Sequence, residues 1–145
     1  MIAVDTNLLV YAHRRDSEWH EPARDFVKRL AESRNQWVIP WPCIHEFLAI
    51  VTHPKIYAPP SSLAQAIEQV ETWLNSPSIV LIGESDDHWN LLQELIRNGK
   101  VVGPMVHDAR IVAICVAHGV NEFCSADRDF SRFPRLAIRN PLLNQ

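Results

Sequence analysis

The first twelve residues, Met1-Ile-Ala-Val-Asp5-Thr-Asn-Leu-Leu-Val-Tyr-Ala12, decide how the fold is interpreted. The apolar run Ile2–Val4 predicts a short buried strand that ends at Asp5, and Thr6–Ala12 predicts a helix. No other charged side chain precedes Arg14. Asp5 is a good N-cap for the helix. A carboxylate between a strand and a helix also faces the crevice where α/β sheets bind ligands, so Asp5 is a candidate site residue as well.

Strand-like runs alternate with helical stretches along the rest of the chain. The predicted strands are Ile2–Val4, Trp37–Ile39, Ile79–Ile82, Glu122–Cys124 and Leu136–Ile138. Between them, apolar residues recur at helical spacing, as in the stripe Leu63, Ala66, Ile67, Val70 and Leu74. This alternation predicts an α/β fold with three layers, in which a mostly parallel sheet of about five strands lies between helices. Because no linker divides the chain, residues 1–145 are expected to form a single domain.

Composition limits the environment and the partners. Three cysteines without a CxxC pair are typical of buried residues in a reducing compartment. No apolar run approaches roughly 18 residues, so we expect a cytoplasmic protein without a membrane span. The net charge of −3 gives no overall signature of nucleic-acid binding. Contacts with phosphates would have to come from bound cations or from local arginines, for which the candidates are Arg14, Arg15, Arg110 and Arg128.

Glu46 is the only formally charged residue between Asn35 and Pro54. The helix predicted over Trp41–Val51 is apolar almost all round, which is typical of a largely buried helix. A buried carboxylate is strongly penalised unless it has a partner or a metal. Two interpretations of Glu46 stay open: it forms an ion pair with a distant arginine, or it belongs to a metal site.

Two further acidic positions lie beside predicted strand ends. Asp108 is near the start of a helix that ends at Gly119, on the same face as the apolar Ile111 and Cys115. An N-cap would also explain Asp108. Asp127 follows the strand Glu122–Cys124, although a solvated turn would explain it equally well.

Together the four acids are expected to converge on one rim of the sheet. Two carboxylates about 4 Å apart repel by about 4 kcal/mol at an effective dielectric constant near 20. Four in one cleft therefore need protonation or a divalent cation. An all-oxygen site suits Mg²⁺ or Mn²⁺, whereas zinc prefers nitrogen and sulfur.

These segments resemble a known family. MIAVDTNLLVYA (1–12), the isolated Glu46, MVHDARIVAIC (105–115) and FCSADRDFSRF (123–133) match, in order, the four acidic motifs of PIN domains. The resemblance spans essentially the whole chain and is closest to VapC-like toxins, including FPRLAIRNPL (133–142). It implies a PIN-like α/β/α sandwich and a Mg²⁺- or Mn²⁺-dependent endoribonuclease acting on tRNA or rRNA. It also implies a homodimer that a cognate VapB-like antitoxin inhibits.

The resemblance assigns roles to individual residues. The catalytic acids would be Asp5, Glu46, Asp108 and Asp127. All of these except Glu46 are expected to ligate the metal, and Thr6, Ser125 and Asp129 would support them. The choice between Asp127 and Asp129 stays open at this point. The alternative function is a PIN-like module that binds RNA or protein without cleaving RNA.

Overall fold

The computed structural model describes residues 1–143 of the chain. Its sheet has five strands: β1 (Ile2–Val4), β2 (Trp37–Pro40), β3 (Ile79–Ile82), β4 (Glu122–Cys124) and β5 (Ala137–Arg139). The strands are parallel and lie in the order β3-β2-β1-β4-β5. The predicted parallel sheet is therefore confirmed. Its last strand begins one residue later than the expected Leu136.

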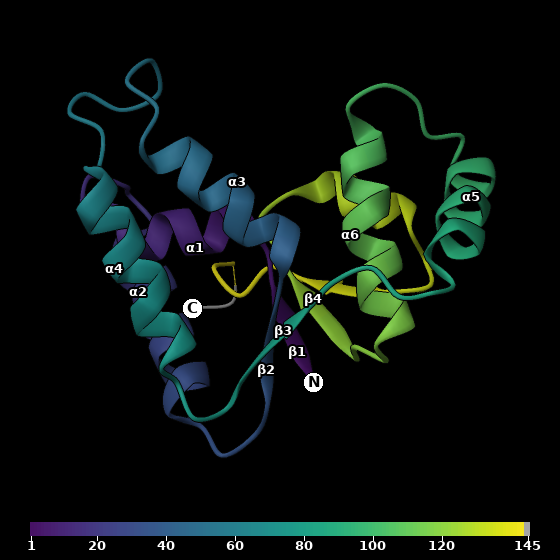
Figure 1. Cartoon of the computed structure of the whole chain (residues 1–145), viewed down its shortest axis with the longest axis horizontal. Coiled ribbons are helices and arrows are strands. Elements are labelled where there is room, and N and C mark those ends of the chain that lie inside the picture. Colours follow the sequence, from purple (N-terminus) through teal and green to yellow (C-terminus); the bar gives the residue numbers. More distant parts are fainter. Residues whose placement is uncertain (144–145) are drawn as a thin grey trace.

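Helices cover both faces of this sheet. They are α1 (Thr6–His13), α2 (His20–Glu32), α3 (Trp41–Val51), α4 (Leu63–Leu74), α5 (His88–Gly99) and α6 (Met105–Ala117), with a 3₁₀ helix η1 (Arg128–Arg132). Figure 1 shows α1, α2 and α4 on one side of the sheet and α5 and α6 on the other. The three-layer α/β/α fold is thus confirmed. None of the helices within residues 1–143 is long and apolar enough to cross a membrane.

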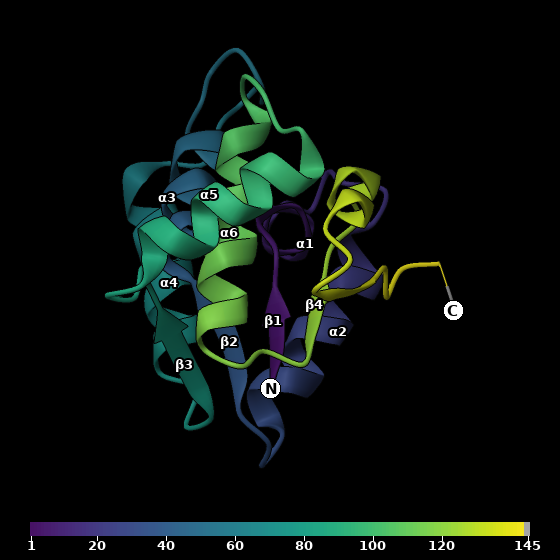
Figure 2. The same ribbon diagram turned by 90° about the vertical axis from the view of Figure 1, so that its right-hand side faces the viewer.

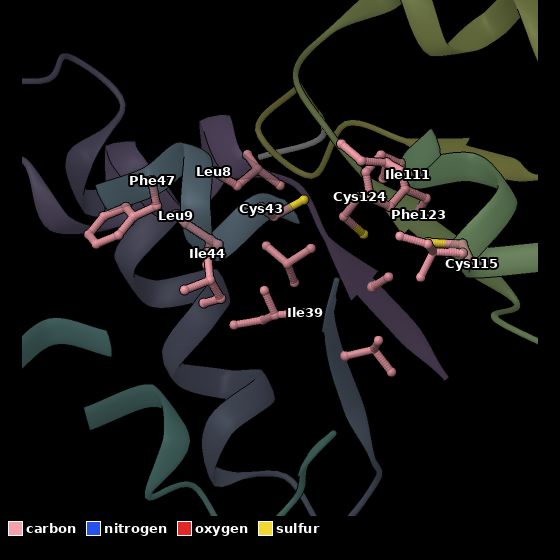
Figure 3. Close-up of a cluster of buried hydrophobic side chains, with 14 of the residues drawn as sticks. Leu8, Leu9, Ile39, Cys43, Ile44, Phe47, Ile111, Cys115, Phe123 and Cys124 are labelled. Atoms are coloured by element: carbon pink, nitrogen blue, oxygen red, sulfur yellow. The ribbon is translucent and has the colours of Figure 1, made fainter. Parts of the chain in front are cut away.

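The core lies on both sides of the strands. In β2, Trp37, Val38 and Ile39 are fully buried, as expected for a parallel strand covered by helices on each face. Figure 3 shows side chains from α1, α3, α6 and β4 meeting around the sheet. All three cysteines are free and buried among them, as the sequence predicts: Cys43, Cys115 and Cys124.

One predicted apolar stripe is confirmed only in part: Ala66 and Val70 of α4 are buried, but the other members are not. On α4, Leu63 and Ile67 are exposed to 74% and 53%, although both belong to the stripe expected to face the core. The helix instead turns Trp73 inward, where its ring packs against Phe47 with 4.8 Å between ring centroids. Burying an indole removes more apolar surface from water than burying a leucine, which explains the rotation.

The strand order places a ligand crevice at the centre of the sheet. The chain passes from β1 outward through β2 to β3 and then returns to β4 on the other side of β1. Figure 2 shows β1 between β2 and β4, with α6 in front of β2. In such sheets, ligands bind beyond the carboxyl ends of the strands where the order reverses. Asp5 and Ser125 each follow directly after one of these two central strands.

Candidate active site

Asp5 occupies the junction between β1 and α1 and is only 4% exposed. As the N-cap of α1, its Oδ1 accepts a hydrogen bond from the backbone N–H of Thr6 at 2.7 Å. Its Oδ2 accepts one from the Ser125 hydroxyl, also at 2.7 Å. The thiol of Cys43 lies 3.6 Å from Oδ1. Capping of α1 and a place in the candidate site are therefore compatible for Asp5, because Oδ1 binds the helix and Oδ2 binds Ser125 at the end of β4.

The surroundings of Asp5 disfavour its charge. Burial, the largest cause, raises the pKa of Asp5 to about 7, and the nearby negative charge of Glu46 acts in the same direction. Hydrogen bonds donated by Ser125, Thr6 and Cys43 oppose this shift without cancelling it. A buried carboxylate of this kind is poised to gain from a positive charge placed next to it.

Glu46 reaches the same place from α3. Its Oε2 accepts a hydrogen bond from the Thr6 hydroxyl at 2.9 Å. Thr6 therefore binds Asp5 through its backbone and Glu46 through its side chain. Glu46 is only half-buried, since α3 presents a solvent-facing strip that includes Trp41 and His45. Glu46 is thus more exposed than predicted, and none of the ion pairs within residues 1–143 involves it.

The remaining acids form a tight cluster. Asp108, Asp127 and Asp129 each offer a carboxylate oxygen, and these oxygens lie within 4.8 Å of one another. Asp108 lies in the first turn of α6, whose N-cap is Pro104, so the capping explanation for Asp108 is wrong. Asp127 caps η1 by accepting the N–H of Asp129 at 2.9 Å. The structure thus places both candidates of the fourth motif beside Asp108.

The negative charges of the cluster Asp108, Asp127 and Asp129 also lie close to one another. Burial raises the pKa of Asp108 to about 6, and the negative charges of Asp127, Asp129 and Glu46 add to the shift. The negative charge of Glu46 raises the pKa of both Asp5 and Asp108, so Glu46 links the Asp5 side of the site to the cluster electrostatically.

Asn7 is a site residue that sequence reasoning missed. Its Nδ2 donates to Asp5 Oδ2 at 3.3 Å and to Ser125 Oγ at 3.2 Å, while its Oδ1 accepts the N–H of Ala126 at 3.2 Å. Ser125 Oγ in turn accepts the N–H of Asp127 at 3.0 Å. Asn7 therefore ties α1 to the loop that carries Asp127. The presence of an amide among the apolar residues of the first helix is a signal that could have identified it.

The donor set fits a hard divalent cation. All candidate ligands are carboxylate oxygens, which Mg²⁺ and Mn²⁺ prefer. The one thiol at the site does not compete as a ligand, because burial and the charge of Asp5 raise the pKa of Cys43 well above its ordinary value. Burial and neighbouring negative charge raise the pKa values of Asp5 and Asp108, so a cation bound at these acids would favour their ionised forms.

Two of the four arginines expected to meet phosphates are engaged elsewhere. Arg14 pairs with Asp16 at 2.6 Å, and only 11% of its side chain is exposed. Arg110 pairs with Glu84 at 2.5 Å. Arg15 and Arg128 are exposed. Of these two, only Arg128 adjoins an acid of the site, since it follows Asp127 in the chain.

Comparisons with known proteins agree with this geometry. The PIN domain family matches residues 2–136. Ribonuclease VapC48 of Mycobacterium tuberculosis is 31% identical over 137 residues, covering 94% of each chain. Ribonuclease VapC43 of the same organism is 32% identical over 145 residues, covering 100% of this chain and 98% of its own.

Solved structures show the same fold. VapBC2 from Rickettsia felis, bound to a promoter DNA fragment, aligns with a TM-score of 0.67 at 21% identity, covering 97% of this chain and 98% of the other. The sarcin–ricin loop cleaving toxin VapC20 of Mycobacterium tuberculosis aligns with a TM-score of 0.66 at 17% identity, covering 90% and 93%. The resemblance to PIN domains is confirmed: the chain belongs to the PIN-domain family, in the group of VapC ribonucleases.

Proposed function

We propose that this protein is a metal-dependent endoribonuclease that hydrolyses RNA phosphodiester bonds, and the toxin of a VapBC-type toxin–antitoxin pair. The observation that carries the proposal is the convergence of five carboxylates at the reversal point of the sheet. The VapC ribonuclease relatives, which align over nearly the full chain, support the same activity.

In this proposal Asp5, Asp108 and Asp127 hold the cation, with Asp129 beside them. Mg²⁺ is the expected ion and Mn²⁺ an acceptable substitute, because both take all-oxygen ligands. Such an ion polarises a phosphoryl oxygen and lowers the pKa of an attacking water. Its positive charge would also return Asp5 and Asp108 to their ionised forms at neutral pH.

The protein's own residues position the reacting groups. Glu46, held by the Thr6 hydroxyl, is placed to accept a hydrogen bond from the attacking water. Ser125 and Asn7 fix the Asp5 carboxylate and the loop of Asp127 relative to each other. Catalysis of this kind depends mainly on positioning and on charge stabilisation of the phosphoryl group.

The expected partners follow from the same assignment. We propose tRNA or rRNA as substrate and a VapB-like antitoxin as inhibitor, supported by structural relatives solved as VapBC complexes. We further propose that residues 1–145 form one cytoplasmic domain that assembles as a homodimer. The exposed apolar residues of α4, Leu63, Ile67 and Leu74, support the dimer.

The dimer has its own test. Ile67→Glu should shift sedimentation velocity from the dimer to the monomer, because it places a charge in the proposed apolar interface. Gln65→Glu adds the same charge on the opposite side of α4 and keeps the capping box, so it should leave the dimer intact. A monomeric wild-type protein would refute the dimer.

The nuclease is tested with end-labelled tRNA and rRNA and purified protein free of antitoxin. Wild type, Asp5→Asn and the exposed control Asp86→Asn are compared in Mg²⁺, Mn²⁺ and EDTA. Discrete fragments should need the metal, persist in the control and disappear in Asp5→Asn. If folded wild-type protein binds these RNAs but cuts none at any metal concentration, the binding-only alternative replaces the nuclease.

A further inference from the structure

A pocket of about 300 Å³ opens directly beside the acidic cluster. Its lining residues are Ser125, Ala126, Asp127, Arg128, Ser131, Ile138, Asn140 and Leu143. Asp127 belongs to both the pocket and the cluster, and Ser125 donates a hydrogen bond to Asp5. A ligand in the pocket would therefore lie next to the acidic cluster.

The pocket combines an apolar floor with polar groups. Ala126 and Ile138 are half-buried in it, and Leu143 is 64% exposed. Ser131 brings a hydroxyl and Asn140 an amide, whose Oδ1 accepts the N–H of Leu142 at 3.0 Å. This hydrogen bond fixes the plane of the amide.

Arg128 supplies the positive charge. Its side chain is exposed, and within residues 1–143 it enters none of the ion pairs. A protein with a net charge of −3 needs such local cations to meet a polyanion. A larger hollow of about 990 Å³ between α2 and α4 also contains arginines, but it shares no residue with the acidic site.

We infer that this pocket is a subsite for one nucleobase of single-stranded RNA, next to the scissile phosphate. The inference rests on the proposed nuclease function. Pockets that enclose small ligands begin at about 300 Å³, which suits a single base. Aliphatic side chains cover the faces of the base, whereas the Asn140 amide and the Ser131 hydroxyl meet its hydrogen-bonding edge. Arg128 binds the adjoining phosphate oxygen.

Nucleotide binding tests the subsite independently of cleavage. The four nucleoside 5′-monophosphates are titrated into metal-free ¹⁵N-labelled protein, with ribose 5-phosphate as the probe that lacks a base. Amide signals of Ser131, Asn140 and Leu143 should shift with the nucleotides, by amounts that depend on the base, and should not shift with ribose 5-phosphate. Shifts confined to other regions, or identical shifts with ribose 5-phosphate, would overturn the inference.

Two matched variants sharpen the test. Arg128→Gln should weaken nucleotide binding about tenfold, as expected for the loss of one charge-assisted hydrogen bond. Arg132→Gln removes the same charge from the same 3₁₀ helix but does not line the pocket, so it should have no effect. Equal weakening by both variants would mean general charge attraction and no subsite. Circular dichroism checks that both variants are folded.

Cleavage assays then separate the two proposals. An abasic nucleotide on one side of the scissile bond should lower kcat/KM about tenfold for wild type, given the usual contribution of base stacking. Ser131→Trp, which fills the pocket, should remove this difference. If the abasic substitution leaves kcat/KM of the wild type unchanged, the subsite is refuted, whereas the proposed nuclease function stands. Nucleotide binding in the pocket without cleavage of any RNA supports the subsite and overturns the nuclease.

Discussion

Replacing Asp5 by Asn should stabilise the metal-free protein at alkaline pH. In the folded protein, burial raises the pKa of Asp5 from 3.8 to about 7. Keeping Asp5 ionised at pH 8 therefore costs on the order of 4 kcal/mol, since each pH unit between those values corresponds to about 1.4 kcal/mol. The amide loses part of the hydrogen bonding with Ser125 and Asn7, at a cost of about 1–2 kcal/mol. The net gain is about 2 kcal/mol, or about 4–8 °C in Tm for a chain of this size.

The sign of this effect depends on pH. Because the folded pKa of Asp5 lies above the unfolded one, the native state holds a proton that the unfolded state releases. The contribution of Asp5 to the stability of the wild type in EDTA should therefore be greatest below about pH 4 and be lost as the pH rises to about 7. Asp5→Asn lacks this loss, so the variant should be less stable than the wild type by about 1–2 kcal/mol at pH 4, where only the lost hydrogen bonds count, and more stable at pH 8.

Thermal unfolding followed by circular dichroism in EDTA, at intervals from pH 4 to pH 8, measures both curves. Asp86→Asn serves as the control, because Asp86 is exposed and its change should leave the curve unaltered. The reasoning is refuted if Asp5→Asn melts below the wild type at pH 8. That result would make the Asp5 carboxylate a structural requirement of the fold.

Three further predictions concern the neighbours of Asp5. Thr6→Val removes the hydroxyl bound to Glu46 and keeps the backbone cap. Single-turnover cleavage should slow at least tenfold while Tm changes little. An unchanged cleavage rate would exclude a role of Thr6 in positioning Glu46. Asn7→Ala should lower the free energy of unfolding in urea by about 1–3 kcal/mol, because it removes hydrogen bonds to the part-buried Asp5 and Ser125 side chains. An unchanged free energy of unfolding would contradict the role of Asn7 in joining α1 to the loop of Asp127. Mn²⁺ at about a hundred times its Kd should stabilise the wild type by about 2.7 kcal/mol at pH 8. The rise in Tm caused by Mn²⁺ should be clearly smaller for Asp108→Asn. Equal rises in Tm would show that Asp108 is not a metal ligand.

Local sequence signals were sufficient for the centre of the fold. A three-residue apolar run that ends in Asp5 predicted β1, its buried position and the cap of α1 together. The expected convergence of the acids at one rim depends only on where parallel strands end, and the structure places them there. Strand ends follow from short-range patterns, which is why these features could be read from the sequence.

Features that depend on which side chains compete for a place in the core could not be predicted from local sequence patterns. Periodicity could not show that α4 turns Trp73 toward Phe47 and leaves Ile67 in solvent. It also overestimated the burial of Glu46, because an apolar composition does not reveal which side of α3 lacks a covering element. The role of Asn7 depends on Ser125, 118 residues away in the chain, and no local pattern carries that information.

The order of the strands also bears on synthesis of the chain. β1 emerges from the ribosome first, but its partner β4 begins only at Glu122, and the cluster needs Asp127 and Asp129 just beyond it. Since chains fold from the N-terminus as they are made, the acidic site stays incomplete until most of the protein has been translated. A chain released before β4 therefore lacks Asp127 and Asp129, so premature termination yields fragments without a complete acidic site.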